Sequence, residues 1–174
     1  IIRIEDEIKH AENYMNIQKI RYKNAFEISF DIAPDILSAC TVKLVVQPIL
    51  ENAIYYGVGD MDEDDHPRIL VRGFKKEEEI YLVVSDNGMG MRREDVENIL
   101  TDNQKVPKHG SGVGLINVHT RIQLMFGVRY GLTVESEPDE GTTVTIHLPA
   151  IPYTKENCEI LEAPGKPPRN EVEP

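Results

Sequence analysis

Two glycine-rich segments flank a polar stretch in the middle of the chain. Residues 86–90 (Asp-Asn-Gly-Met-Gly) follow an alternating apolar run, and residues 110–114 (Gly-Ser-Gly-Val-Gly) precede a run with helical spacing. Glycine allows a positive φ or the close approach of a ligand, and a glycine-rich turn before a helix presents unpaired N–H groups to an anion. Either segment alone would be an ordinary loop, but together they indicate a phosphate site.

Familiar phosphate-binding loops do not fit these segments. No Gly-Lys-Ser/Thr sequence follows them, which excludes a Walker loop. Residues 110–114 also lack the spacing and the preceding strand of a dinucleotide-binding fingerprint.

Length and composition exclude several classes of protein. The length of 174 residues predicts one domain, and 40% hydrophobic residues exclude a chain that is disordered overall. The net charge of −11 argues against a nucleic-acid partner, because such affinity depends on Lys and Arg. No apolar run approaches the roughly 18 residues of a membrane span. Cys40 and Cys158 are too few for a disulfide scaffold or a four-ligand zinc cluster, and we interpret them as packed or surface thiols.

The first residues have the apolar spacing of a helix seam, which involves Ile1, Ile4, Ile8, Ala11, Met15 and Tyr22. Such a seam fits the end of a helix that pairs with another helix, or a single amphipathic helix on its own domain. Because the chain starts with Ile1 inside this pattern, we expect a further segment upstream.

The remaining periodicity predicts an α+β fold. Strands are expected at residues 26–32, 68–74, 80–85, 130–136 and 142–148, and helices at residues 41–58, 93–100 and 113–126. We expect a two-layer sandwich with helices on one face of a mixed, mostly antiparallel sheet. Proline-rich residues 150–174 are expected to be disordered.

The helix expected at residues 41–58 carries polar groups among its apolar ones. Thr41 is a candidate N-cap, Gly57 and Gly59 are the expected stop, and Pro48 should kink the helix. Pro48, Asn52 and Tyr56 are four residues apart and should lie along one line of the helix. Asn52 could therefore hold Mg²⁺, which accepts a few oxygen ligands together with phosphates.

Four segments in this order resemble one family: residues 51–53, 86–90, 110–115 and 141–143. Together they are similar to the ATP-binding catalytic domain of sensor histidine kinases, which has the Bergerat fold and is related to gyrase and to chaperone and mismatch-repair ATPases. The resemblance spans residues 1–149. Residues 14–22, 47–54 and 114–122 resemble the LytS/YesM type in particular, in which Pro48 is expected.

The resemblance implies a site for ATP and Mg²⁺. Asp86 would accept a hydrogen bond from the adenine amino group, and Thr142 would support that carboxylate or a water bound to adenine. Gly88 and Gly90 would let the chain pass the base. Asn52 would be the metal ligand.

The resemblance also implies a lid over the phosphates at residues 101–112. Backbone N–H groups of Gly110, Gly112 and Gly114 would bind the phosphates, and Lys105 and Lys108 would add positive charge. Tyr55 departs from the basic residue that many of these kinases carry, and Tyr56 departs from a frequent histidine. The phenol of Tyr56 could still donate a hydrogen bond.

By the same resemblance, residues 1–24 would end a dimerisation or linker helix, and residues 25–149 would form the ATP-binding domain. The γ-phosphate would pass to a histidine upstream of this chain and then to a response regulator. No histidine here has the matching context, so no catalytic residue is assigned. The homodimer and the attachment to a bacterial inner membrane would depend on upstream segments, and this domain would be cytoplasmic.

Other functions share these segments. An ATP-hydrolysing clamp places a general-base Glu one turn before the Asn, where this chain has Pro48, and Glu51 lies about 100° around the helix. A serine kinase acting on an anti-anti-sigma factor is disfavoured by the helix seam. A degenerate nucleotide-binding module stays open.

Overall fold

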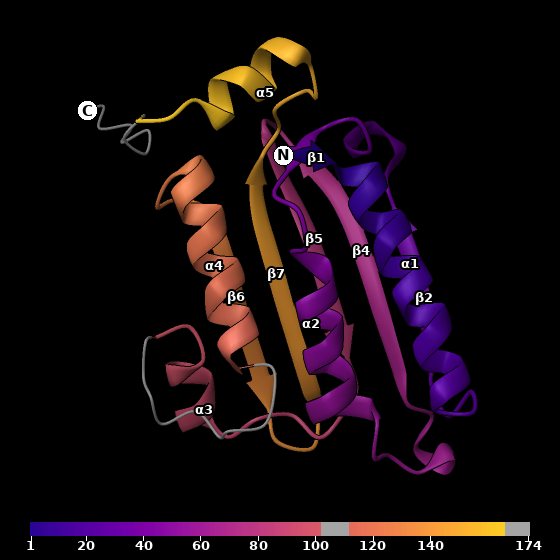
Figure 1. The fold of residues 1–174 in the computed structure, drawn as a ribbon. Coiled ribbons are helices and arrows are strands. Elements are labelled where there is room, and N and C mark those ends of the chain that lie inside the picture. Colours follow the sequence, from indigo (N-terminus) through magenta and orange to yellow (C-terminus); the bar gives the residue numbers. More distant parts are fainter. Residues whose placement is uncertain (102–111, 166–174) are drawn as a thin grey trace.

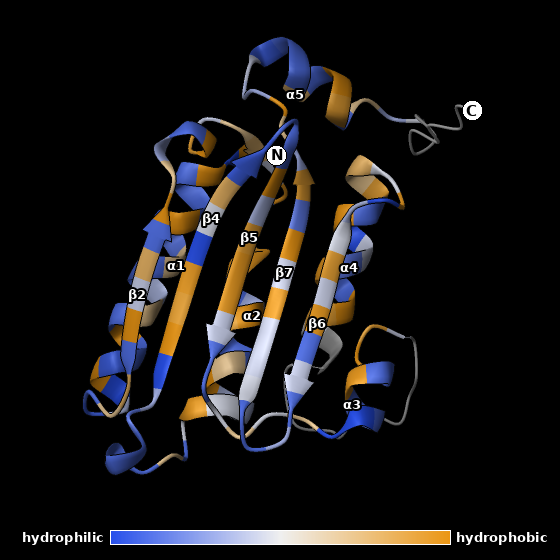
Figure 2. Cartoon of the chain, turned by 180° about the vertical axis from the view of Figure 1, so that it is seen from behind, coloured by the Kyte–Doolittle hydropathy of each residue, from blue (hydrophilic) through white to orange (hydrophobic). Residues whose placement is uncertain are grey.

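The computed structural model describes residues 1–101 and 112–165 of the protein. Within them, one sheet has the strand order β2-β4-β5-β7-β6. In chain order these strands are β2 (Glu27–Ile32), β4 (Arg68–Lys76), β5 (Glu79–Asp86), β6 (Gly131–Glu137) and β7 (Gly141–Pro149). Helices α1 (Ile4–Arg21), α2 (Val46–Asn52) and α4 (Gly112–Phe126) cover one face (Figure 1). From behind, the sheet lies in front of these helices (Figure 2). The expected α+β sandwich is confirmed.

The sheet is mixed, as predicted. Strands β2 and β4 are parallel, whereas β4–β5, β5–β7 and β6–β7 are antiparallel. The β4–β5 hairpin matches the two runs expected at residues 68–74 and 80–85. The register pairs Asp86 at the end of β5 with Thr142 at the start of β7. Two residues more than fifty positions apart are therefore neighbours at one edge of the molecule.

The core lies between the sheet and the helices. Alternate residues of each strand face it, as a half-buried sheet requires; Val71, Leu82 and Ile146 are examples that are fully buried. They pack in one cluster with apolar residues of the helices, such as Ile49 and Ile122. No helix in the described part of the chain is long and apolar enough to cross a bilayer.

Helix α1 packs against its own domain. Ile4, Ile8, Ala11 and Met15 are at most 5% exposed and belong to the same core cluster. Towards its C-terminal end the helix presents apolar side chains to the surface, where Ile20 is 78% exposed. Of the two interpretations of the seam, the amphipathic helix on its own domain describes this packing.

The helix expected from Thr41 starts later. Thr41 lies in strand β3 (Cys40–Thr41), which pairs with β1 (Ile2–Arg3), so the N-cap prediction is wrong. Leu44 has a positive φ of 58°, which is incompatible with a continuous α-helix, and α2 begins only at Val46. Pro48 consequently lies in the first turn of α2, where a missing N–H breaks no helical hydrogen bond, and the predicted kink has no cause.

The second half of the same expected helix is also different. After Asn52 the chain continues as a π-helix, η2 (Ala53–Val58). A π-helix has i→i+5 hydrogen bonds, and short π segments occur often at functional sites. Pro48, Asn52 and Tyr56 were expected along one line of an α-helix. Only Pro48 and Asn52 lie in the α-helix, whereas Tyr56 lies in the wider π-helical turn.

The C-terminal segment contains a helix, α5 (Lys155–Glu162), where we expected disorder. Its N-cap is Thr154, whose hydroxyl accepts a hydrogen bond from the N–H of Asn157 at 3.1 Å. The prolines that suggested disorder flank this helix at Pro152 and Pro164 rather than interrupt it. The expectation for residues 166–174 falls outside the described residues. Shorter elements are η1 (Pro34–Ile36), η3 (Glu63–Asp65) and α3 (Arg93–Asn98), the last within the helix predicted at residues 93–100.

Candidate functional site

Asp86 ends strand β5 with a partly buried carboxylate. Its Oδ1 accepts a hydrogen bond from the backbone N–H of Gly88 at 2.9 Å. Burial raises the pKa of Asp86 to about 6, although hydrogen bonds from the backbone of Gly88 and Thr142 act in the opposite direction. The carboxylate is thus ionised at neutral pH and costly to keep dry, which favours a ligand that donates a hydrogen bond to it.

Glycines surround Asp86 because side chains would not fit. A Cβ on Gly57 would lie 2.8 Å from Oδ1 of Asp86, and a Cβ on Gly88 would lie 2.2 Å from the Cα of Gly57. On the other side, a Cβ on Gly141 would lie 2.0 Å from the carbonyl oxygen of Asp86. The sequence did not predict that Gly57 lies beside Asp86, because Gly57 was interpreted there only as a helix stop. The available signal was the position of Gly57 a few residues after Asn52, in the same apolar segment.

The chain after Asp86 is fixed along the β6–β7 turn. Gly90 has a φ of 70°, and a Cβ there would lie 2.0 Å from the carbonyl oxygen of Glu137. The N–H of Met91 donates to Oγ of Ser136 at 2.8 Å, and the N–H of Asp139 donates to the carbonyl of Met89 at 2.7 Å. Gly90 is therefore required by the backbone itself, as the Asp-x-Gly-x-Gly pattern suggested.

Thr142 supports Asp86 through its backbone. Its hydroxyl lies 2.8 Å from Oγ of Ser136, whose hydroxyl is also within 2.9 Å of the carbonyl of Gly141. The pair Ser136–Thr142 thus holds the start of β7 beside Asp86. Ser136 had no recognisable signal in the sequence, because a serine in an exposed strand is ordinary.

Asn52 is the last residue of α2 and is 2% exposed. The C-terminal end of α2 and the N-terminal end of α4 lie at the same end of the molecule as the end of β5 (Figure 1). Gly114, in the first turn of α4, would place a Cβ 3.5 Å from Cβ of Pro48. This packing brings Asn52, at the end of α2, and the N-terminus of α4 to one region of the domain.

Of the other residues predicted for the site, two lie in the described part of the chain. Gly112 is the first residue of α4. Tyr56 is half-buried in η2, where its ring makes an edge contact with Tyr55 at a centroid distance of 4.8 Å. Lys105, Lys108 and Gly110 lie outside the described residues.

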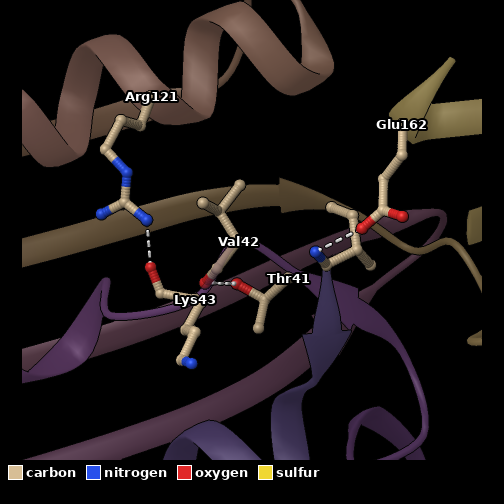
Figure 3. A network of polar contacts seen from close by, with 6 residues as sticks. Thr41, Val42, Lys43, Arg121 and Glu162 are labelled. Carbon is tan, nitrogen blue, oxygen red and sulfur yellow. Dashed lines mark hydrogen bonds and ion pairs between the residues drawn. The ribbon is translucent and has the colours of Figure 1, made fainter.

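The start of α2 is held between α1 and α4. Glu7 of α1 is 1% exposed, and its carboxylate accepts hydrogen bonds from the N–H groups of Leu44, Val45 and Val46 at 3.0, 2.7 and 3.0 Å. From the other side, the guanidinium of Arg121 in α4 donates to the carbonyl of Lys43 (Figure 3). Since Asn52 ends the same short helix, these contacts fix its position.

Glu51 points towards α1. Its Oε1 accepts a hydrogen bond from Nε2 of Gln47 at 3.0 Å, and Oε1 of Gln47 lies 2.6 Å from Nε2 of His10. The charge of Glu51 also affects Tyr14 of α1. The pKa of Tyr14 is raised to about 12, mainly by burial and next by the charge of Glu51. The carboxylate is therefore directed away from the line of Pro48 and Asn52, as helical geometry predicted.

The environment of His119 should make the stability of the folded protein depend on pH. Its Nδ1 accepts the N–H of Leu132 at 2.9 Å, and burial lowers the pKa of its imidazole. The folded state therefore favours the neutral ring, and its contribution to stability is lost as the pH falls from the unfolded-state pKa of about 6.5. We expect the wild-type protein to lose stability relative to His119→Asn between pH 7 and 5, because the amide oxygen keeps an acceptor without titrating. Urea titrations at several pH values measure this, and parallel pH profiles would contradict it.

The comparisons with known proteins agree with this geometry. Residues 40–152 match the family model described as histidine kinase-, DNA gyrase B- and HSP90-like ATPases, and the chain belongs to this family. Within it, the chain is similar to the sensor histidine kinase YesM of Bacillus subtilis strain 168, with 32% identity over 149 residues. It is 29% identical to the sensor protein LytS of Bacillus anthracis over the same length. The expected LytS/YesM-type ATP-binding domain is confirmed.

The extent of these matches is uneven. The alignments with YesM and LytS cover 86% of this chain but 24% and 25% of those proteins, so the chain spans about a quarter of their length. Among solved structures, the nucleotide-free catalytic domain of the histidine kinase ThkA superposes with a TM-score of 0.65 and 14% identity. That match covers 87% of this chain and 95% of the other and supports the fold.

Proposed function

We propose that this domain binds ATP and Mg²⁺ and transfers the γ-phosphate to a histidine that lies upstream in the full protein. The partly buried Asp86 carboxylate at the end of β5, enclosed by Gly57, Gly88 and Gly141, carries this proposal. A charged acceptor in a narrow, glycine-lined site suits the exocyclic amino group of adenine. The fold and the kinase relatives support the same assignment.

Recognition of the base depends on the ionised form of Asp86. Adenine presents an amino group to the carboxylate, whereas guanine would present a carbonyl oxygen and leave two desolvated acceptors opposed. Gly88 and Gly90 keep the chain close enough for the flat base to pass. Thr142 holds the carboxylate through the backbone, and its hydroxyl is oriented by Ser136.

The phosphate half of the proposed site consists of Asn52 and the start of α4. An amide oxygen at the buried end of α2, beside a helix N-terminus, fits Mg²⁺, which binds a few protein oxygens and completes its shell with phosphate and water. A bound ion would neutralise charge on the phosphates. Backbone N–H groups of Gly112 and Gly114 suit the phosphate oxygens. The roles of Tyr56, Lys105, Lys108 and Gly110 remain predictions of the sequence.

Transfer is favoured over hydrolysis by the position of the carboxylates near Asn52. An ATPase needs a base that activates water, yet Pro48 occupies the position one turn before Asn52, and Glu51 is bound to Gln47 on the α1 side. The ATP-hydrolysing clamp is therefore the less favoured function. A nucleotide-binding module without transfer would share the Asp86 site and is separated from a kinase only by assay.

The proposal extends to the full protein. The acceptor histidine, the homodimer contact and the membrane attachment would lie upstream, with this domain on the cytoplasmic side of a bacterial inner membrane. A response regulator would take the phosphate from the histidine. Residues 1–24 would join the domain to these segments, residues 25–149 would form the ATP-binding domain, and residues 150–174 would follow it.

The isolated domain should bind Mg-ATP but release phosphate very slowly, because Glu51 points away from the site and the acceptor histidine is elsewhere. Calorimetry measures the binding, and a phosphate-release assay measures the turnover. A rate near an ordinary enzymatic value of about 10 per second would instead support the hydrolysing clamp. Absence of ATP binding would contradict the nucleotide site itself.

A further inference from the structure

The segment before α5 is attached to the β1–β3 corner of the domain. Ala39 and Pro152 form an isolated antiparallel bridge. The N–H of Cys40 donates to the carbonyl of Ile151 at 2.7 Å, and the N–H of Tyr153 donates to the carbonyl of Ser38 at 2.8 Å. Figure 1 shows α5 beside this corner, at the end of the molecule opposite α3. These contacts hold α5 at a fixed place relative to β3.

The two cysteines of the chain meet at this attachment. Cys40 in β3 is 0% exposed, while Cys158 in α5 is partly exposed. The carbonyl oxygen of Pro152 lies 3.5 Å from Sγ of Cys40 and 2.8 Å from Nδ2 of Asn157, the residue before Cys158. The side chain of Cys158 lies close enough to Cys40 to contribute to the raised pKa of the Cys40 thiol, and both cysteines are free.

We propose that Cys40 and Cys158 form a reversible disulfide that fastens α5 to β3, with a low-molecular-weight disulfide as the oxidant. The sequence alone suggested only packed or surface thiols, since nothing in it relates residues 40 and 158. The fold supplies the missing relation, because the segment before α5 brings the partly exposed Cys158 to the strand that contains the buried Cys40.

The accessibility of the two thiols sets the order of the reaction. The Cys158 thiolate attacks one sulfur of the small disulfide, which forms a mixed disulfide and expels one small thiolate. The Cys40 thiolate then attacks Sγ of Cys158, which closes the internal bond and expels the second small thiolate. The cysteines lose two electrons, the small disulfide is reduced to two thiols, and the protons of Cys40 and Cys158 pass to these thiolates through solvent.

The second step is the slower one. Burial, followed by the neighbouring Cys158, raises the pKa of the Cys40 thiol to about 11. Only a small fraction is therefore thiolate at neutral pH, and closure should accelerate as the pH rises. The finished bond would close a loop that contains most of the domain, which restricts the unfolded chain and stabilises the fold.

The experiment uses the 174-residue protein with oxidised glutathione, quenched with acid and alkylated at intervals. Intact mass should show a transient glutathione adduct, followed by a product that has lost two hydrogens and has no alkylatable thiol. Peptide mapping should join residue 40 to residue 158. The oxidised protein should unfold at a higher temperature than the reduced protein, and dithiothreitol should abolish the difference.

Single variants separate this reaction from ordinary thiol chemistry. Cys40→Ser should retain the glutathione adduct on Cys158, because the resolving thiol is absent. Cys158→Ser should react much more slowly than the wild-type protein, because Cys40 is buried. A persistent adduct in the wild-type protein, or disulfide-linked dimers in place of the internal bond, would overturn the proposal. A disulfide that forms without raising the unfolding temperature would contradict the fastening of α5.

Discussion

Asp86→Asn should weaken ATP binding by about 10- to 150-fold. The substitution removes a charge-assisted hydrogen bond worth roughly 1.5–3 kcal/mol, and each 1.4 kcal/mol corresponds to a factor of ten in affinity. The structure favours the upper part of this range. The N–H of Gly88 requires an oxygen at the Oδ1 position, so the amide would direct its NH₂ group towards the adenine amino group.

The same substitution should stabilise the protein without ATP. The pKa of Asp86 is raised in the folded state, so its contribution to stability is complete below the unfolded-state pKa and is lost as the pH rises through about 6. Removing the charge should therefore raise the free energy of unfolding at pH 7 by about 1–2 kcal/mol. Weaker binding would then have a local cause and could not be ascribed to partial unfolding.

Calorimetry with ATP and thermal unfolding without it measure the two effects. Asp31→Asn makes the same chemical change at an exposed position of β2 and should alter neither quantity appreciably. The wild-type protein should prefer ATP strongly over GTP, and Asp86→Asn should lose most of this preference. Unchanged ATP affinity in Asp86→Asn would refute the adenine half of the site, whatever happens at Asn52.

Glu7→Ala should lower the free energy of unfolding by about 3 kcal/mol. It would leave the buried N–H groups of Leu44, Val45 and Val46 without their acceptor, and each unpaired group costs about 1 kcal/mol or more. For a domain of this size the midpoint of thermal unfolding should fall by about 6–12 °C. Glu7→Gln should be milder, because the amide oxygen can still accept from two of the three groups.

Glu12→Ala provides the matched control for Glu7. Glu12 lies on the exposed side of the same helix, so its removal should change stability by no more than about 0.5 kcal/mol. Differential scanning calorimetry compares the three variants. Equal effects of Glu7→Ala and Glu12→Ala would show that α2 does not depend on this carboxylate.

Local periodicity was sufficient for most of the sheet. The alternation at residues 26–32 and the two hairpins gave strands that the structure places within a few residues. The helix predicted from residue 41 failed because Val42, Val45 and Val46 have helical spacing by coincidence. There the chain forms the short strand β3 and then passes through the positive φ of Leu44. Helix α5 was missed because proline content was counted without regard to where the prolines lie.

The candidate site was predictable where a motif carries its own backbone requirement. Gly88 and Gly90 follow from the turn after a strand, and Asp86 from its place before them. The roles of Gly57, Ser136 and Glu7 depend on contacts between segments far apart in the chain. Glu7 is three residues after Ile4 and four before Ala11, which placed it on the buried side of α1. Glutamate is rarely fully buried unless it is paired, so burial of Glu7 could not be predicted before its hydrogen-bond partners were known.

Strand β7 is the last strand of the chain but lies inside the sheet, between β5 and β6. A growing polypeptide that has reached the end of α4 already contains Asn52 and Asp86, yet neither Gly141 nor Thr142 is present beside Asp86. Synthesis must therefore pass residue 149 before β7 can insert between β5 and β6 and complete the adenine site. A ribosome-bound chain stalled before Gly141 should be unable to bind ATP, and truncation at that point should remove nucleotide binding together with β7, the strand that pairs with both β5 and β6.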